Sequence, residues 1–384
     1  MVVIMAESLS EKDNLNLAGL LKSFFIGSIV LIISTQTLST YIIQPLIFDS
    51  TLVRHGRYAI PFDAWETVEK DEQYSVVGIG SSLTQYGLNG SCIDSSIMTH
   101  DVGVYNLGIP GGYPYVEMMQ TERAINSRPD VIILELNPIN LFSFSDATGL
   151  NDYIEMRFEI NSLFLKRSDF GGWEEIIRVE DLSHIDHPLS NPYNSENTYF
   201  NSAAEYHLKS LVGSEINDGS WAKNAGLQYF AVPDPHTSEW NNYLQNPPLL
   251  PRYLDTFNNT ELEYYENTTI PNFLERARYN PHSESNLNKL ALEYMVKSFS
   301  NNGIKTILLS YPIYPTAVSL LSENQFDQHN NTILDLSGYD NVESLNLIWL
   351  DIWENQDFYD IEHLDVSGRE KVCSIMSAKL AQMI

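Results

Sequence analysis

Cysteine is nearly absent from this sequence. The chain has 384 residues and only two cysteines, Cys92 and Cys373, which are far apart and follow no metal-type spacing. A framework of several disulfides is therefore excluded, and a zinc site is not expected. A single bridge between Cys92 and Cys373 stays open, but no feature of the sequence supports it.

Basic residues are also scarce. The chain has 22 Lys and Arg against 50 Asp and Glu, which gives a formal net charge of -28. A surface of this sign repels nucleic acid and anionic lipid, so we expect no nucleic-acid partner. The acidic residues are spread along the chain and not gathered in a tail, which is typical of a solvated surface.

Long uncharged runs are rare, and the main one lies near the N-terminus. Residues 23–48 carry no charge, and a spanning helix needs about 20 mostly apolar residues. No clean cleavage site follows this run. We predict a short tail over 1–22 and an uncleaved transmembrane anchor over 23–48; the alternative is a long amphipathic or buried helix. A large acidic domain behind one such anchor is usually translocated, so we expect a single-pass membrane protein whose main domain is extracytoplasmic.

Five short apolar runs are present beyond the anchor. They are rich in Val, Ile and Leu without strict alternation, as strands covered on both faces should be. The runs are "SVVGIG" at 75–80, "VGVYNLG" at 102–108, "DVIILEL" at 130–136, "IKTILLSY" at 304–311 and "LNLIWLD" at 345–351.

Helical patterns separate or follow several of these runs. They occupy 115–126, 284–303 with Gly303 at the expected C-terminal end, and the last 18 residues of the chain. This alternation predicts an α/β fold, a three-layer sandwich with a mostly parallel five-stranded sheet. We place its first part at 49–149, an insertion or cap at 150–280 and its second part at 281–384.

Polar residues follow the expected strands at the points where sites form in open α/β sheets, outside the carboxyl ends. Ser81 and Ser82 follow the first run, Gly111 stands in a glycine-rich loop after the second, and Asn137 follows the third. The segment after the fifth run holds Asp360 and His363. We therefore expect four features to meet at one edge of the sheet. They are a nucleophile, a glycine whose backbone can come close to a ligand, an amide side chain and an Asp-x-x-His pair.

These residue types suit acyl transfer. Serine is a weak nucleophile without an adjacent base, and His363 can act as that base while Asp360 fixes its tautomer. The backbone N–H groups of Ser82 and Gly111 and the side-chain amide of Asn137 suit an oxyanion hole. Ser81 is the rival serine and can instead cap a helix. Rivals of the other residues are the carboxylates Glu362 and Asp365 and the glycines Gly108 and Gly112.

Four segments resemble, in the same order, the blocks of the SGNH (GDSL-type) hydrolase superfamily. They are "GIGSSLTQYG" with Ser82 at the serine, "YNLGIPGG" with Gly111 at the oxyanion glycine, "ELNPIN" with Asn137 at the oxyanion asparagine, and "DFYDIEHLDVSGREKV" with Asp360 and His363 as acid and base. The resemblance covers about 75–140 and 284–384. It implies a flavodoxin-like three-layer fold, a serine mechanism and no metal or organic cofactor.

Two departures bear on the substrate. Ser81 stands where the family has Asp, and Pro138 replaces the Asp of the third block. Gly-Ser-Ser variants resemble a membrane-anchored branch that includes proteins of D-alanine transfer and of polysaccharide O-acetylation. The resemblance therefore implies an esterase or O-acyltransferase acting on acylated small molecules or surface polysaccharides, with a membrane protein partner that supplies acyl groups. A non-catalytic glycan-binding or scaffold protein on the same fold is the alternative.

Two features outside the four blocks have competing interpretations. The pair His184 and His187 beside Asp186 suggests a metal, but no third ligand is evident, so no metal site is expected. The aromatic residues of the insertion could stack on sugar rings, although core packing is the preferred interpretation; they are Tyr193, Tyr199, Trp221, Tyr229 and Trp240.

Overall fold

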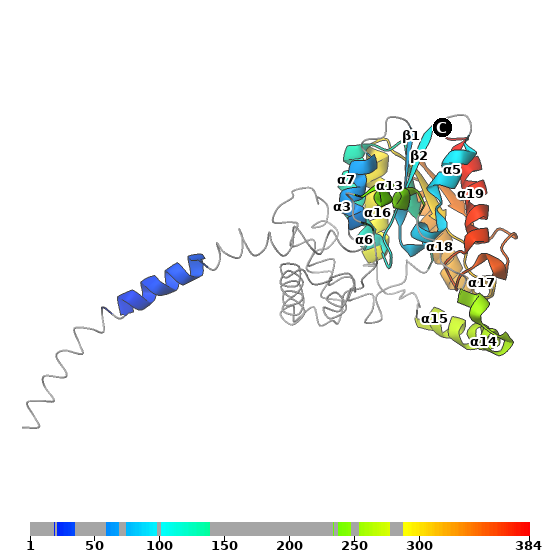
Figure 1. Cartoon of the computed structure of the whole chain (residues 1–384), viewed down its shortest axis with the longest axis horizontal. Coiled ribbons are helices and arrows are strands. Elements are labelled where there is room, and N and C mark those ends of the chain that lie inside the picture. The colour runs from blue at the N-terminus through cyan, green and yellow to red at the C-terminus, as the bar shows by residue number, and fades with distance from the viewer. Residues whose placement is uncertain are drawn as a thin grey trace, which may run out of the picture. The chain divides into compact units, whose positions relative to one another are not determined.

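The computed structural model of the protein describes residues 19, 21–34, 59–68, 74–97, 101–138, 233, 237–246, 253–276 and 287–384 (Figure 1). The chain divides into two compact units, Met1–Thr51 and Leu52–Ile384.

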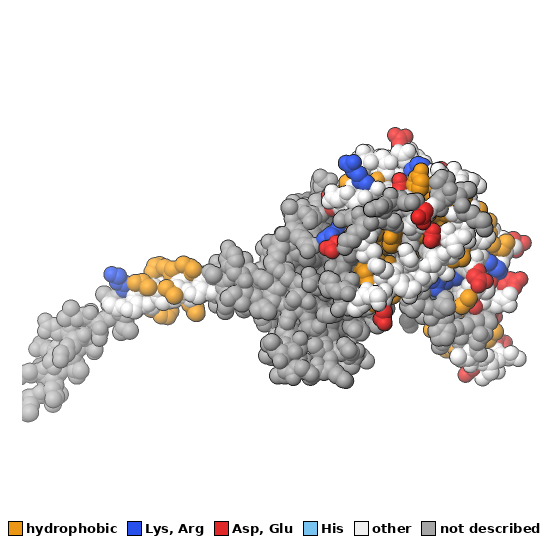
Figure 2. Space-filling model, turned by 45° about the horizontal axis from the view of Figure 1, so that its top comes forward, with side chains coloured by type: hydrophobic (Ala, Val, Ile, Leu, Met, Phe, Trp, Pro, Cys, Tyr) orange, Lys and Arg blue, Asp and Glu red, His pale blue; other side chains and the backbone are white. Residues whose placement is uncertain are grey.

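The described part of the first unit is a helix over 21–34. Its large apolar side chains are exposed, for example Phe24 at 76% and Leu31 at 66%, and Figure 2 shows hydrophobic side chains along it. Within the described residues no helix is both long and apolar enough to cross a membrane. Positions 35–48 of the predicted anchor lie outside the described residues.

The second unit is an α/β fold built on a five-stranded sheet. All neighbouring strands pair in parallel, in the order β2-β1-β3-β4-β5. The strands are β1 (Tyr74–Gly80), β2 (Val102–Gly108), β3 (Val131–Glu135), β4 (Lys305–Ser310) and β5 (Val342–Asn346). The prediction of a mostly parallel five-stranded sheet is confirmed, and every strand is parallel.

The last predicted strand was placed wrongly. The sequence pattern predicted it at 345–351, whereas β5 covers Val342–Asn346. Among the described strands this edge strand pairs only with β4, and after Val342 its residues are exposed or partly exposed, so it lacks the apolar signature of a central strand. The apolar run beyond it turns away and contributes Leu347 and Ile348 to the core.

Apolar side chains form two clusters that include alternate residues of the strands. Val77 and Ile79 belong to one cluster and Val76 to the other, because successive strand residues point to opposite faces. The first cluster includes residues of α3 (Ala59–Val68), η2 (Met118–Gln120), α7 (Thr121–Ser127), α13 (Ser238–Gln245), α16 (Leu287–Asn301) and α18 (Glu323–Leu336), and α6 (Pro114–Glu117) packs against α16. The second includes residues of α4 (Ser82–Gly87), α5 (Gly90–Ser96), η5 (Tyr253–Thr256), η6 (Tyr265–Thr269), α15 (Ile270–Arg276), α17 (Pro315–Leu320) and α19 (Val366–Leu380); α14 (Asn259–Tyr264) packs against this cluster, and η7 (Asn355–Asp357) packs against α19.

The predicted helices are found with small changes. The pattern over 284–303 corresponds to α16, and Gly303 follows it with a φ of 73°, a left-handed conformation that favours glycine. The pattern over 115–126 is divided among α6, η2 and α7. The C-terminal pattern corresponds to α19, which ends at Leu380.

The described parts of the predicted insertion contribute side chains to both apolar clusters, and α13 packs on β2 while α15 packs on α17. Trp240 on α13 is 2% exposed and belongs to the first cluster, so core packing is confirmed for this aromatic residue. Tyr265 and Ile270 belong to the second cluster. Residues 150–232, with Tyr193, Tyr199, Trp221 and Tyr229, lie outside the described residues.

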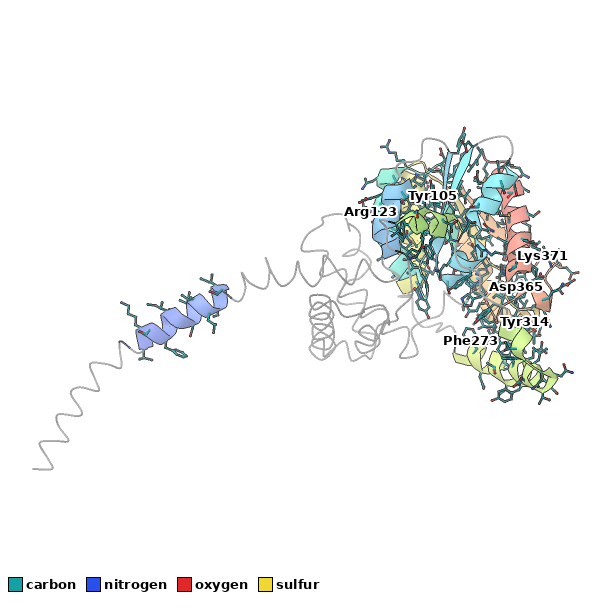
Figure 3. The ribbon with its side chains drawn as sticks, in the orientation of Figure 1. Tyr105, Arg123, Phe273, Tyr314, Asp365 and Lys371 are labelled. Atoms are coloured by element: carbon teal, nitrogen blue, oxygen red, sulfur yellow. A yellow bond between two sulfur atoms is a disulfide. The ribbon has the colours of Figure 1, made fainter. Side chains whose placement is uncertain are left out.

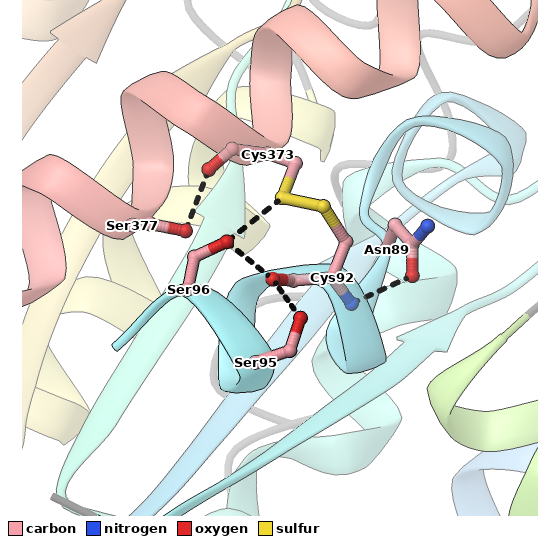
Figure 4. The surroundings of a disulfide bond; sticks show 6 residues. All are labelled: Asn89, Cys92, Ser95, Ser96, Cys373 and Ser377. Atoms are coloured by element: carbon pink, nitrogen blue, oxygen red, sulfur yellow. Dashed lines mark hydrogen bonds between the residues drawn. A yellow bond between two sulfur atoms is a disulfide. The ribbon is translucent and has the colours of Figure 1, made fainter. Parts of the chain in front are cut away.

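Cys92 and Cys373 form a disulfide (Figure 4). It joins α5, which follows β1 and α4, to the middle of α19. Ser95 and Ser96 both donate hydrogen bonds to the Cys92 carbonyl oxygen, and Ser377 donates one to the Cys373 carbonyl oxygen. The bond thus ties the N-terminal part of the sheet domain to the last helix.

Removal of this disulfide should destabilise the protein. The double variant Cys92→Ala/Cys373→Ala releases a 281-residue loop in the unfolded chain, and loss of a native disulfide typically costs about 2–5 kcal/mol. We expect its free energy of unfolding, measured by denaturant titration of the full chain, to fall by that amount. A reducing agent should destabilise the wild type similarly and leave the variant unaffected; equal stability of oxidised and reduced wild type would contradict this expectation.

Candidate active site

The carboxyl end of β1 carries two serines in different environments. Gly80 ends the strand, Ser81 is the N-cap of α4 and Ser82 is its first residue. The Ser81 side chain is 4% exposed and accepts a hydrogen bond from the Leu83 N–H, so Ser81 takes the capping role. Ser82 is partly exposed and is the serine that faces the histidine.

Ser82, His363 and Asp360 form one continuous set of contacts. Ser82 Oγ lies 2.8 Å from His363 Nε2, and His363 Nδ1 lies 2.9 Å from Asp360 Oδ2. A carboxylate can only accept, so the proton of a neutral imidazole belongs on Nδ1. Nε2 is then an acceptor for the Ser82 hydroxyl. The structure brings together the three residues that the sequence proposed for nucleophile, base and acid.

The acid and base are held by a tight loop over 357–365. Asp360 Oδ1 accepts from the backbone N–H groups of Glu362 and His363, at 2.9 and 2.8 Å. The Tyr359 N–H donates to the His363 carbonyl oxygen at 2.8 Å, which closes the loop. The carboxylate and the imidazole of this loop are therefore oriented by their own backbone.

The same loop is fixed to the start of α19 (Figure 3). Asp365 caps this helix by accepting from the N–H groups of Ser367 and Gly368, so this rival carboxylate has a structural task. Lys371 Nζ lies 2.5 Å from Asp357 Oδ2, on a side chain that is fully buried. The helix therefore anchors the segment that carries Asp360 and His363.

The charges around His363 favour its protonated form. Burial lowers the pKa of His363, but the hydrogen bond and charge of Asp360, with the charges of Glu362 and Glu135, raise it more, so the net direction is upward from 6.5. Burial raises the pKa of Asp360, but the hydrogen bonds from His363 and from the loop backbone outweigh it and hold this pKa below 3.8. Tyr86 on α4 completes the surroundings with its ring edge-on to the imidazole.

Glu362, the other rival carboxylate, does not contact His363 Nδ1. Burial first, and then the charges of Asp360 and Glu135, raise its pKa to about 7, while the charge of His363 lowers it. This carboxyl group therefore titrates near neutral pH beside the candidate base.

Two residues that the sequence analysis missed hold α4 at its two ends. Glu135, at the end of β3, accepts four hydrogen bonds from Ser81 and Thr84. Asn106, on β2, donates to the carbonyl oxygens of Thr84, Gln85 and Leu88. The signal for both was a polar residue inside an otherwise apolar buried run.

The predicted oxyanion residues flank β1. Gly111 has a φ of 63° in the loop after β2, and the Ile109 N–H in the same loop donates to the Gly80 carbonyl oxygen at 2.7 Å. Asn137 lies two residues beyond β3, fully buried, and its amide donates to the Tyr311 carbonyl oxygen at 3.4 Å. Both residues thus follow strands adjacent to β1, and their role toward an oxyanion stays a prediction.

Among the residues that the structure describes, no group of three or more His, Cys, Asp or Glu side chains is arranged to hold a metal ion. His184 and His187 lie outside this part of the chain.

The environment of His363 predicts a titration that Asp360 controls. In Asp360→Asn the negative charge is lost while the burial of His363 remains. We therefore expect the pKa of His363, which lies above 6.5 in the wild type, to be lower in the variant. The measurement is the pH titration of the ring nitrogens by NMR in histidine-labelled protein, with His363→Gln to assign the signal. An unchanged pKa in Asp360→Asn would show that the carboxylate does not act on this imidazole.

No protein-family model matches the chain, and a search of curated proteins finds no match.

Proposed function

We propose that the protein is a serine esterase or O-acyltransferase of the SGNH type that forms an acyl-enzyme. The observation that carries this proposal is the contact of Ser82 Oγ with His363 Nε2 at 2.8 Å, backed by Asp360 at 2.9 Å. Nucleophile and base within hydrogen-bond reach, with the base oriented by a third group, is the arrangement that activates a serine.

The first half of the reaction transfers the acyl group to the enzyme. Ser82 Oγ attacks the ester carbonyl carbon as its proton passes to His363 Nε2, and Asp360 stabilises the imidazolium. The C–O bond to the alcohol then breaks, and the alcohol leaves with the proton from His363. Ser82 is left as an ester of the acyl group.

The second half releases the acyl group. Water, or a sugar hydroxyl in the transferase case, loses its proton to His363 and attacks the Ser82 ester. Collapse of this intermediate returns the proton to Ser82 Oγ and frees the acid or the new ester. All proton transfers use the same nitrogen, which the loop over 357–365 keeps in place.

Both tetrahedral intermediates carry an oxyanion that needs preorganised donors. We assign the N–H groups of Ser82 and Gly111 and the side-chain amide of Asn137 to this role. The long contact of Asn137 with Tyr311 at 3.4 Å is a weak bond, and an anionic oxygen is the stronger acceptor.

The topology supports the same family. The order β2-β1-β3-β4-β5 is that of flavodoxin-like doubly wound sheets, whose ligands bind where the strand order reverses, between β1 and β3. Ser82 follows β1, and Glu135 ends β3. We therefore interpret the fold as the three-layer sandwich of SGNH hydrolases, with 49–149 and 281–384 as its two parts and 150–280 as an insertion.

The proposed location is outside the cytoplasm. The disulfide between Cys92 and Cys373 supports it, because such bonds persist in oxidising compartments and are rare in the cytosol. The apolar helix over 21–34 is consistent with a membrane anchor over 23–48. Esters of surface polysaccharides or acylated small molecules are the proposed substrates, with a membrane protein as the proposed acyl supplier.

An activity-based probe tests this proposal. A fluorophosphonate treated with the full chain should label Ser82, as located by mass spectrometry of the adduct. Ser82→Ala removes the nucleophile and should abolish labelling, and His363→Ala should slow it by at least about 10³-fold.

Ser95→Ala is the matched control, because Ser95 is an exposed serine on α5 that bonds only the backbone of its own helix. It should label like the wild type. A folded wild type that does not react would favour the alternative, a glycan-binding or scaffold protein on this fold.

A further inference from the structure

We propose that Glu135 is a positioning residue for the nucleophile, a buried carboxylate that fixes the turn between β1 and α4 and so the direction of Ser82 Oγ. This inference rests on the proposed function, because it concerns how the same serine is aimed. Glu135 acts through Ser81, the residue before Ser82, and through Thr84, the second residue after it.

Four hydrogen bonds join Glu135 to this turn. Oε2 accepts from the Ser81 N–H at 2.8 Å, the Thr84 N–H at 3.0 Å and the Thr84 hydroxyl at 2.7 Å. Oε1 accepts from the Ser81 hydroxyl at 2.7 Å. One side chain therefore fixes the backbone of the residue before Ser82 and of the second residue after it.

The carboxylate is enclosed. Glu135 is 0% exposed, and a Cβ added at Gly80 would lie 2.5 Å from Glu135 Oε2 and 2.1 Å from the Thr84 hydroxyl oxygen. The carboxylate thus packs directly on the last residue of β1, and only a glycine leaves room for it. Such close packing leaves the turn little freedom to move relative to β3.

The burial of a charge at this point calls for an explanation. A buried carboxylate is costly unless hydrogen bonds satisfy it, and an apolar residue would fill a strand interior at lower cost. Hydrogen bonds to an ionised acceptor are shorter than neutral ones and about twice as strong. The four bonds of Glu135 all hold the turn between β1 and α4 that carries Ser82, which we call the nucleophile turn. A positioning role requires this arrangement.

The position also explains the Gly-Ser-Ser sequence. The Gly-Asp-Ser motif of the SGNH family, which this sequence resembles, has an Asp immediately before the serine, where this chain has Ser81. Here the carboxylate comes from the neighbouring strand, and Ser81 supplies both a donor to it and the cap of α4. The carboxylate is therefore present at the turn, although it comes from a distant part of the sequence.

The test is the rate of fluorophosphonate labelling of Ser82 in the full chain, resolved into the maximal rate kinact and the half-saturating concentration KI. Glu135→Gln keeps the shape but loses the charge and one acceptor. We expect kinact to fall at least about tenfold while KI stays within about twofold, because a misaimed nucleophile slows chemistry and not binding.

Glu117→Gln is the matched control. Glu117 is also a fully buried carboxyl group near Glu135, but its oxygens make no hydrogen bond within the described residues, so it does not hold the nucleophile turn. Its kinact should stay within about twofold of the wild type. A tenfold loss in this variant too would overturn the proposal, because the effect would then belong to buried charge in general.

If Glu135→Gln does not fold, Thr84→Val tests the positioning role of Glu135 instead. It removes one of the four hydrogen bonds and should lower kinact about two- to tenfold with an unchanged KI. An unchanged kinact in Thr84→Val, or in folded Glu135→Gln, would overturn the role of Glu135 while leaving the proposed function intact. A wild type that is not labelled would instead overturn both.

Discussion

The contact between Ser82 and His363 joins two segments that are 281 residues apart, and the described structure holds both segments in place. On one side, the parallel strands end at the same level: Gly80 pairs with Gly108, and Ile79 with Leu134. This common edge lets β2 and β3 both reach the short helix that starts with Ser82. On the other side, a loop closed on itself and fixed to α19 presents the imidazole.

The site places several acidic groups around one base. Asp360 contacts the imidazole directly, while Glu362 and Glu135 act on it through their charge. Under the proposed function, such a field favours the imidazolium that forms when the serine attacks, but it opposes the negative oxyanion that forms at the same time. Four donors surround Glu135, so part of its charge is compensated where it is closest to the nucleophile turn. The electrostatics of the proposed site therefore depend on local donors as much as on the net charge of the surface.

Local patterns in the sequence were sufficient to locate the central strands and to select Ser82, Asp360 and His363, which the structure brings into contact. Buried parallel strands read as apolar runs, and Ser82, Asp360 and His363 follow such runs or stand in a distinctive short motif. The edge strand β5 was misplaced because it is half exposed and its apolar neighbours leave the sheet. Glu135 and Asn106 were missed because their tasks depend on which strands are adjacent, and the pairing of β1 with both β2 and β3 is not a local property. The pairing of Cys92 with Cys373 is non-local in the same way.

The disulfide has a further consequence for the covalent topology. Cys92 lies ten residues after Ser82, and Cys373 lies ten residues after His363. The disulfide therefore joins the same two segments of the chain as the contact between Ser82 and His363. It converts the chain from Cys92 to Cys373 into a closed ring that contains the whole of 150–280. A protease that cuts once between Cys92 and His363 produces two fragments, one with Ser82 and one with His363, that stay covalently joined through the disulfide. A single cut in the ring therefore leaves Ser82 and His363 in one covalently connected molecule.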